Sequence, residues 1–252
     1  MTSEDEQKRQ APTGRDPWMG GDWAAAGKDG QGAEAEPGAP VGQEVPEQPP
    51  GSDRQRPPEV ETWRLFVAID LPRHVKEEIA GMVDSMPQHA KPLVRWGPRE
   101  GIHLTLQFLG DVEPGRVPEI TEKLTDAASR TGRFSVSLSK PGAFPSYRDA
   151  KILWVGFEGE VRRLAQLHGR VVGALSTLGF EAERRPFVPH ATVGRVARDV
   201  RGREAGDVGY GWRNTRRSRH QTDVPVESIT LFRSHLMPGG PRYEPVFTAP
   251  LG

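Results

Sequence analysis

Apolar residues between positions 61 and 252 recur with two different periods, one typical of strands and the other of helices. Alternating positions and short apolar, β-branched runs predict strands at Trp63–Asp70, Val94–Trp96, Gly101–Gly110, Phe134–Leu138, Lys151–Phe157, Pro186–Val196, Val226–His235 and Tyr243–Phe247. The longer period predicts helices at Arg73–Met86, Val117–Ser129 and Glu160–Leu178, and Gly179 is expected to end the last of them. A turn is expected at Pro141–Pro145, and an irregular Gly- and Arg-rich segment between Ala197 and Thr222. The pattern therefore predicts an α+β domain.

Two of the predicted strands carry a histidine and a threonine two positions apart. Successive side chains of a strand point to opposite faces, so His103 shares a face with Thr105, and His190 shares a face with Thr192. A single copy of this pattern is more often a half-buried strand with a polar side. Two copies, one in each half of the domain, indicate a shared site in a cleft between the halves.

Residues 1–60 differ in composition from the rest of the chain. They are rich in Gly, Pro, Ala, Glu and Gln and poor in branched aliphatic residues, so they bury too little apolar surface to offset the entropy cost of ordering. We therefore expect a disordered tail at 1–60 and one domain at 61–252. Trp18 and Trp23 are the aromatic residues of this tail, and they are either a weak docking motif or simply exposed.

The composition excludes several classes of protein. The chain has 252 residues, no cysteine and a formal net charge of zero. The lack of cysteine excludes disulfides and thiolate metal sites, and zero net charge gives no general attraction to nucleic acid. No apolar run reaches the roughly 18 residues of a membrane-spanning helix, and the N-terminus lacks the apolar core of a signal peptide. We therefore expect a cytoplasmic monomer that makes no membrane contact.

Cofactor sites are disfavoured on the same grounds. Neither a G-x-G-x-x-G nor a G-x-x-x-x-G-K-[ST] sequence opens a helix, which disfavours dinucleotide and nucleoside triphosphate sites of those types. Two histidines without a third clustered ligand do not make a zinc site, and threonine is a poor zinc ligand. We expect no metal and no cofactor.

Several segments, taken in order along the chain, carry a resemblance to a known family: Arg64–Pro72, His103–Gly110, Gly142–Pro145, Leu153–Gly156, Leu178–Phe180, Arg185–Arg195 and Leu231–Ser234. Together they resemble the bacterial and archaeal RNA 2′,3′-cyclic phosphodiesterases, formerly called 2′–5′ RNA ligases, of the 2H phosphoesterase superfamily. The resemblance runs from about Trp63 to Phe247. It implies a bilobal fold in which two similar halves place antiparallel sheets around a central cleft, with helices on the outside.

The residue types of the two motifs suit the opening of a 2′,3′-cyclic phosphate. The reaction needs a base to deprotonate water and an acid to protonate the departing ribose oxygen, and an imidazole with a pKa near 6.5 serves either role. The hydroxyls of Thr105 and Thr192 suit the non-bridging phosphate oxygens. The resemblance further implies that Arg195 binds the phosphate, that His190 activates water, and that His103 protonates the 3′ oxygen and leaves a 2′-phosphate.

The expected substrates are RNA with 2′,3′-cyclic phosphate ends or small cyclic nucleotides. An RNA 5′-hydroxyl in place of water would turn the same chemistry into a weak 2′–5′ ligation without ATP. The alternative is a non-catalytic module that binds RNA ends or nucleotides. Two imidazoles together with Arg195 favour the enzyme, because a binding module has no need of an acid–base pair.

Other residues have competing interpretations. Phe108 either stacks on a base or belongs to the core, and its neighbours Leu106 and Leu109 favour the core. A basic cluster is either a solvated loop or a guide for an RNA strand; its members are Arg213, Arg216, Arg217 and Arg219. The remaining histidines are expected outside the site: His74, His89, His168, His220 and His235.

Overall fold

The structure, a computed structural model, describes residues 61–216, 222–237 and 240–252. The expected tail at 1–60 lies outside the described residues, as do Arg217, Arg219 and His220. Among the described helices, none has both the length and the apolar character needed to cross a bilayer.

The strands of the described residues form one antiparallel sheet of nine strands. Its order is β7-β4-β5-β6-β3-β1-β8-β9, and β2 pairs with β6 off this path. The strands are β1 (Trp63–Asp70), β2 (Val94–Trp96), β3 (His103–Val112), β4 (Phe134–Pro145), β5 (Ala150–Gly159), β6 (His190–Val196), β7 (Asp223–Val226), β8 (Ser228–Met237) and β9 (Gly240–Pro250).

Four α-helices in the described part of the chain flank the sheet: α1 (Arg73–Asp84), α2 (Val117–Ser129), α3 (Val161–Ser176) and α4 (Gly202–Arg213). Short 3₁₀ turns lie at η2 (Lys91–Leu93), η3 (Arg99–Gly101) and η4 (Pro114–Arg116). The helices cover the sheet because each has one apolar stripe. In α3 this stripe is Leu164, Leu167, Val171 and Leu175, all of them fully buried as their spacing predicts.

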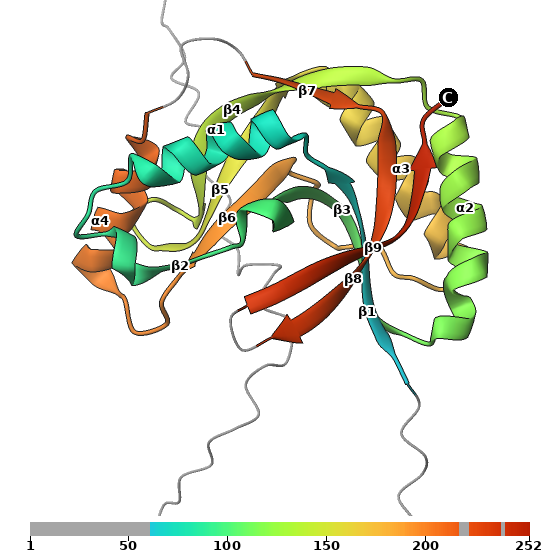
Figure 1. The fold of residues 1–252 in the computed structure, drawn as a ribbon, viewed down its shortest axis with the longest axis horizontal. Coiled ribbons are helices and arrows are strands. Elements are labelled where there is room, and N and C mark those ends of the chain that lie inside the picture. Colours follow the sequence, from blue (N-terminus) through green and yellow to red (C-terminus); the bar gives the residue numbers. More distant parts are fainter. Residues whose placement is uncertain (1–60, 217–221, 238–239) are drawn as a thin grey trace, which may run out of the picture. The chain divides into compact units, whose positions relative to one another are not determined.

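The sheet divides into two lobes. In one lobe, α2 and α3 pack on each other, α2 also packs on β8 and β9, and α3 packs on β3. In the other lobe, α4 packs on β4 and β5. Helix α1 contacts the same lobe through His74, whose Nε2–H donates to the carbonyl of Asp223 on β7 over 3.0 Å. Figure 1 shows α1 and α4 at the left of the view and α2 and α3 at the right, with the strands between them. This arrangement confirms the expected bilobal α+β fold, and each lobe takes elements from both ends of the domain.

The C-terminus of α3 confirms the predicted stop at Gly179. This glycine has φ 86°, a left-handed conformation that favours glycine. Its N–H donates to the carbonyl of Ser176 over 3.0 Å, and the N–H of Phe180 donates to the carbonyl of Leu175 over 3.3 Å. These bonds satisfy carbonyls that the helix end would leave without partners.

Three local predictions were wrong. The segment expected to be irregular contains α4, whose apolar residues Ala205, Val208 and Trp212 are fully buried at helical spacing. Its four glycines obscured this helix because glycine has a low helix propensity. One of them, Gly209, lets α4 approach closely, since an added Cβ would clash with the carbonyl of Tyr147.

The other two corrections concern strand ends. Strand β4 continues through the predicted turn to Pro145, with a register shift between Leu138 and Pro141 that accommodates the prolines. Strand β6 begins at His190 and not at Pro186, because Pro186 and Pro189 have no N–H to donate to a ladder.

Candidate active site

The two predicted motifs meet where the lobes join. Strands β3 and β6 pair at Leu104↔Ala191, and these two residues are 1% and 0% exposed. Each lies directly after the histidine of its own strand. The histidines and threonines therefore point away from the core, on the opposite face of the junction, and all four are partly buried. The structure thus brings together His103, Thr105, His190 and Thr192.

A β-bulge in β6 adds Arg195 to this face. Simple alternation would place Arg195 opposite to His190, because the two residues are five positions apart. The register with β5 passes from Trp154↔Thr192 to Leu153↔Gly194, so Val193 has no partner of its own. Val193 and Gly194 are both buried, and Arg195 is exposed on the side of the histidine.

A matching bulge in β3 shows that the core prediction for Phe108 was wrong. The register with β1 skips Leu106, and Leu106 and Gln107 are both buried. Phe108, five positions after His103, is therefore turned onto the site face, where it is 40% exposed. Its ring lies 5.7 Å from that of Phe66, which lies 4.8 Å from the imidazole of His103.

Both histidines are held by the same hydrogen bond. The Nδ1 atom of His103 lies 2.7 Å from the carbonyl oxygen of Gly101, and that of His190 lies 2.7 Å from the carbonyl oxygen of Val188. A carbonyl only accepts, so Nδ1 carries the proton in each case. In the neutral imidazole the lone pair then lies on Nε2, and in the imidazolium Nε2 carries the exchangeable proton. Either ring can therefore accept or donate a proton at Nε2.

His103 is enclosed by aromatic rings. The ring of Tyr243 meets it edge-on at 5.0 Å, and Phe232 lies 6.1 Å away. Tyr243 also packs against Gly101, where an added Cβ would lie 3.1 Å from the Tyr243 ring. Burial raises the pKa of the Tyr243 hydroxyl, and the positive charge of the Arg195 guanidinium opposes this rise.

This enclosure changes the acidity of His103. Burial lowers its pKa from 6.5 to about 4, because the charged imidazolium loses hydration. The Gly101 carbonyl and the Asp70 carboxylate oppose this shift, whereas Lys76 and His190 add to it. His103 is therefore neutral at pH 7 in the free protein, and its imidazolium form is a strong proton donor.

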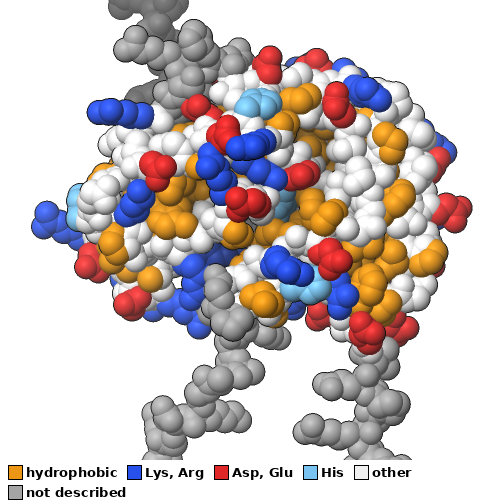
Figure 2. All heavy atoms as spheres, viewed as in Figure 1, with side chains coloured by type: hydrophobic (Ala, Val, Ile, Leu, Met, Phe, Trp, Pro, Cys, Tyr) orange, Lys and Arg blue, Asp and Glu red, His pale blue; other side chains and the backbone are white. Residues whose placement is uncertain are grey.

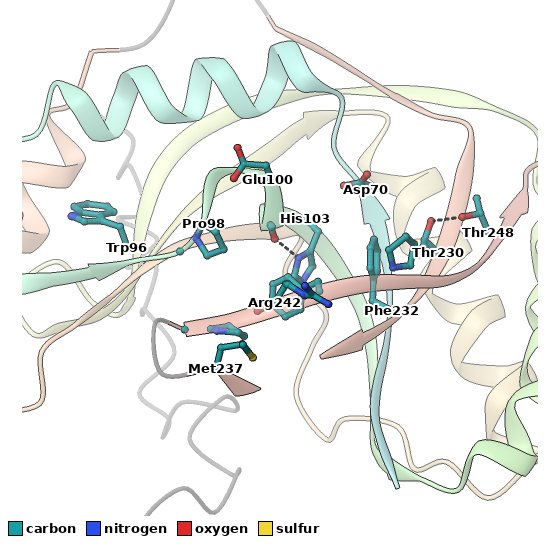
Figure 3. A pocket seen from close by; sticks show the side chains of 16 residues that line it. Asp70, Trp96, Pro98, Glu100, His103, Thr230, Phe232, Met237, Arg242 and Thr248 are labelled. Carbon is teal, nitrogen blue, oxygen red and sulfur yellow. Dashed lines mark hydrogen bonds between the residues drawn. The ribbon is translucent and has the colours of Figure 1, made fainter. Parts of the chain in front are cut away.

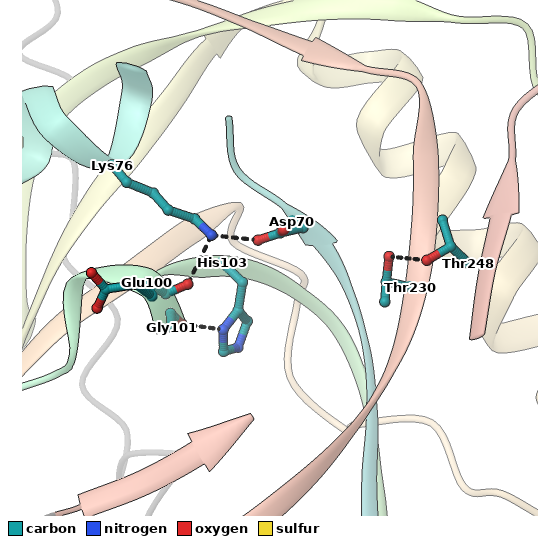
Figure 4. Close-up of polar contacts among 7 residues, drawn as sticks. All are labelled: Asp70, Lys76, Glu100, Gly101, His103, Thr230 and Thr248. Carbon is teal, nitrogen blue, oxygen red and sulfur yellow. Dashed lines mark hydrogen bonds and ion pairs between the residues drawn. The ribbon is translucent and has the colours of Figure 1, made fainter. Parts of the chain in front are cut away.

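Lys76 supports the peptide that holds His103 (Figure 4). Its Nζ donates to Asp70 over 2.7 Å and to the carbonyl of Glu100 over 2.8 Å. The next carbonyl along the chain, that of Gly101, accepts from His103 Nδ1. The Lys76 side chain is only 13% exposed, so its bonds are less screened than those of a surface ion pair. The sequence did not predict Lys76 as a site residue, because nothing local relates a helix lysine to a 3₁₀ turn 24 residues further on.

His190 has different neighbours. Phe144 meets its imidazole edge-on at 5.2 Å, and the Trp154 ring lies 5.8 Å away. Trp154 in turn covers Gly142, where any Cβ would clash with the indole. The Gly142–Pro145 and Leu153–Gly156 segments of the sequence therefore build the wall beside the second histidine.

An open pocket of about 760 Å³ adjoins His103 (Figure 3). Its lining includes Trp96, Pro98, Phe232, Arg242 and Tyr243 but not His190, so it extends from the junction on the His103 side. Trp96, Arg242 and Tyr243 were not predicted as site residues. Pro241–Tyr243 lies near the start of β9, and nothing in the local sequence relates it to Trp96, which lines the same pocket.

Other titratable residues lie away from the junction. The ring of His168 stacks on Phe187 at 4.0 Å, and His235 Nε2 is hydrogen-bonded to the Glu244 carboxylate at 2.6 Å. Among the residues that the structure describes, no three His, Asp or Glu side chains group as metal ligands.

The basic cluster after α4 is described only in part. Arg213 lies over the ring of Tyr147 at 5.5 Å, and the backbone N–H of Arg216 donates to Ser85 Oγ. On the face seen in Figure 2, basic and acidic side chains are interspersed with apolar ones, in keeping with a net charge of zero. A role of this cluster in RNA binding stays a prediction.

The fold and the paired motifs define a phosphoesterase of two similar halves, and comparison with known proteins identifies its family. The profile of the family described as "LigT like Phosphoesterase" matches residues 69–154 and again residues 155–243. The chain belongs to this family. The two matches correspond to the two histidine motifs, one in each.

Individual relatives agree with this assignment. An RNA 2′,3′-cyclic phosphodiesterase of Methanocaldococcus jannaschii is 31% identical over 188 residues, which are 72% of this chain and 96% of the relative. The Escherichia coli enzyme of the same name is 27% identical over 74% of this chain and 95% of its own length.

Solved structures show the same fold. Escherichia coli LigT complexed with 3′-AMP superposes with a TM-score of 0.58 at 28% identity, covering 76% of this chain and 99% of LigT. A Thermus thermophilus protein gives a TM-score of 0.62 at 23% identity over 75% of this chain and 97% of its own, which supports the fold alone.

Proposed function

We propose that this protein is a metal-independent phosphodiesterase that hydrolyses 2′,3′-cyclic phosphate ends of RNA or nucleotides to 2′-phosphomonoesters. Water attacks phosphorus and loses a proton to His190 Nε2. The bond from phosphorus to the 3′ oxygen breaks, and that oxygen takes a proton from Nε2 of His103, whose imidazolium form would be favoured by the negative charge of the bound phosphate over its neutral form in the free protein. The product carries a 2′-phosphate and a free 3′-hydroxyl, and the two histidines have exchanged their protonation states.

The observation that carries this proposal is the mirrored pair of Nδ1–carbonyl hydrogen bonds across one strand junction. Each bond fixes the tautomer so that proton transfer takes place at Nε2, on the side of the site face. A module that only bound nucleotides would not require two imidazoles held in the same tautomer. The names of the relatives support the same substrate class.

The other site residues would hold the phosphoryl group. Thr105 and Thr192 lie on the site face beside the histidines and have hydroxyl donors for the non-bridging oxygens. The Arg195 guanidinium would stabilise the negative charge that develops on those oxygens. A free RNA 5′-hydroxyl in the place of water would give 2′–5′ ligation by the same steps, without ATP.

The proposal is tested with 2′,3′-cyclic AMP in excess EDTA and identification of the product isomer. We expect 2′-AMP, formed at the same rate with and without EDTA. A 3′-AMP product would contradict the assignment of the leaving oxygen. Loss of turnover that returns with one particular divalent ion would contradict metal independence.

A further inference from the structure

The pocket beside His103 has two walls that come from distant parts of the sequence. One wall is the segment from β2 to η3, which includes Trp96, Pro98 and Glu100. The other is the end of the β8–β9 hairpin, which includes Met237 and Arg242. Figure 3 shows Trp96 at one end, Arg242 and Met237 across from Pro98, and His103 between the walls.

The chemistry of these walls suits single-stranded nucleic acid. Trp96 is partly exposed and Met237 is 55% exposed, so apolar surface is available for the faces of bases. The exposed guanidinium of Arg242 suits a backbone phosphate. Of the two carboxylates in the lining, that of Asp70 is neutralised by Lys76, and that of Glu100 is an acceptor for the amino edge of a base.

The direction of the strand follows from the proposed function, on which this inference rests. The oxygen that His103 protonates is the 3′ oxygen of the terminal ribose, so this ribose must lie on the His103 side of the phosphorus. The rest of the RNA continues from the same ribose through its 5′ carbon. A pocket of about 760 Å³ that opens from His103 away from His190 lies where this chain must run.

We propose that the pocket between β2–η3 and the β8–β9 hairpin, lined by Trp96, Met237 and Arg242, binds the nucleotides immediately 5′ of the cyclic phosphate. It takes a single RNA strand, with bases against Trp96 and Met237 and a phosphate on Arg242. Such binding would favour RNA ends over cyclic mononucleotides as substrates.

The test compares two substrates, a single-stranded RNA decamer ending in a 2′,3′-cyclic phosphate and 2′,3′-cyclic AMP. Arg242→Gln should raise the ratio of the KM for the decamer to the KM for the mononucleotide by roughly fivefold. It should also reduce the slope of log KM against log salt concentration for the decamer by about one. Met237→Ser should raise the same ratio without changing that slope. Arg130→Gln, which removes an exposed charge directly after α2 and outside the pocket, should leave the ratio and the activity unchanged.

Unchanged ratios in both Arg242→Gln and Met237→Ser, with melting temperatures like that of the natural protein, would overturn the inference. A ratio that rises in Arg216→Gln instead would also overturn it, because the strand would then pass the cluster after α4. If the natural protein fails to turn over cyclic AMP, the proposed function fails. The groove is then tested by fluorescence anisotropy of a labelled decamer with a 2′-phosphate end, where an equal Kd for Arg242→Gln and the natural protein would exclude it.

Discussion

His103 and His190 begin strands β3 and β6 in the same way and end in different environments. Each is the first residue of its strand, donates from Nδ1 to a carbonyl two residues earlier, and precedes a threonine and a bulge. The fifth position after the histidine is then turned to the same face. That position is Phe108 in one copy and Arg195 in the other.

The difference divides the functions of the two copies. The β3 copy surrounds its histidine with Phe66, Phe232 and Tyr243, and this burial makes the imidazolium unfavourable. The β6 copy contributes the cation, Arg195, that suits a phosphate. In the proposed mechanism, two strands of the same geometry therefore contribute the proton donor and the fixed charge from opposite lobes.

Removal of either histidine should have the largest effect. His103→Ala and His190→Ala should each lower kcat/KM by roughly 10²–10⁴-fold, because a positioned side chain transfers a proton in each case. A cyclic substrate with sulfur as the 3′ bridging atom distinguishes the two, since a thiolate leaves without protonation. We expect this substrate to rescue His103→Ala largely and His190→Ala very little.

The matched control is His168→Ala, which changes a histidine outside the junction and should leave turnover intact. Rescue of His190→Ala alone would exchange the two roles. Rescue of neither variant would show that both histidines mainly bind phosphate.

Changes at the fifth position after each histidine should have smaller effects on turnover than loss of the histidines, and the effects at Arg195 and Phe108 should differ. Arg195→Ala should lower kcat by roughly 10²-fold, as expected when one donor to the developing charge is lost. Arg195→Lys should recover part of this, because lysine keeps the charge but not the two-pronged geometry. Phe108→Ala should affect KM more than kcat, as steady-state kinetics of all three variants would show. A kcat loss in Phe108→Ala equal to that of Arg195→Ala would contradict the division between the two copies.

Loss of the hydrogen bond by which Lys76 supports the His103 segment should have a moderate effect on kcat. Lys76→Met removes the bond to the Glu100 carbonyl and should lower kcat roughly tenfold with little change in KM, because the imidazole is less well placed. Lys91→Met, which removes the ion pair of Lys91 with Asp84, is the control and should be neutral. Equal losses in the two variants would mean that Lys76 contributes only to stability.

The smallest effects concern the acidity of His103. Its imidazole should titrate near pH 4 by NMR, and Lys76→Met should raise this pKa, whereas Asp70→Asn should lower it. In the unfolded chain the same histidine binds a proton near pH 6.5, so the folded state should lose stability as the pH falls from 6.5 towards 4. Urea titrations of His103→Asn should show a weaker loss over this range. An NMR titration of His103 near 6.5 in the natural protein would contradict its enclosure.

The sequence alone determined the parts of this protein that depend on local periodicity. The stripe of α3, the stop at Gly179 and both His-x-Thr strands follow from residues only a few positions apart, because helix and strand periods are properties of neighbouring residues. The repetition of one motif in two halves was enough to predict a shared site. The same local rules failed at α4 and at Pro141–Pro145, where glycine and proline oppose the structure that packing selects.

Tertiary structure decided which residues complete the site. The faces of Phe108 and Arg195 depend on bulges, which exist only relative to the partner strands β1 and β5. The enclosure of His103 requires Tyr243 of β9, and its support requires Lys76 of α1, both distant in sequence. The burial that lowers the pKa of His103 is a property of the packed sheet, because desolvation depends on everything that surrounds the imidazole and not on its neighbours along the chain.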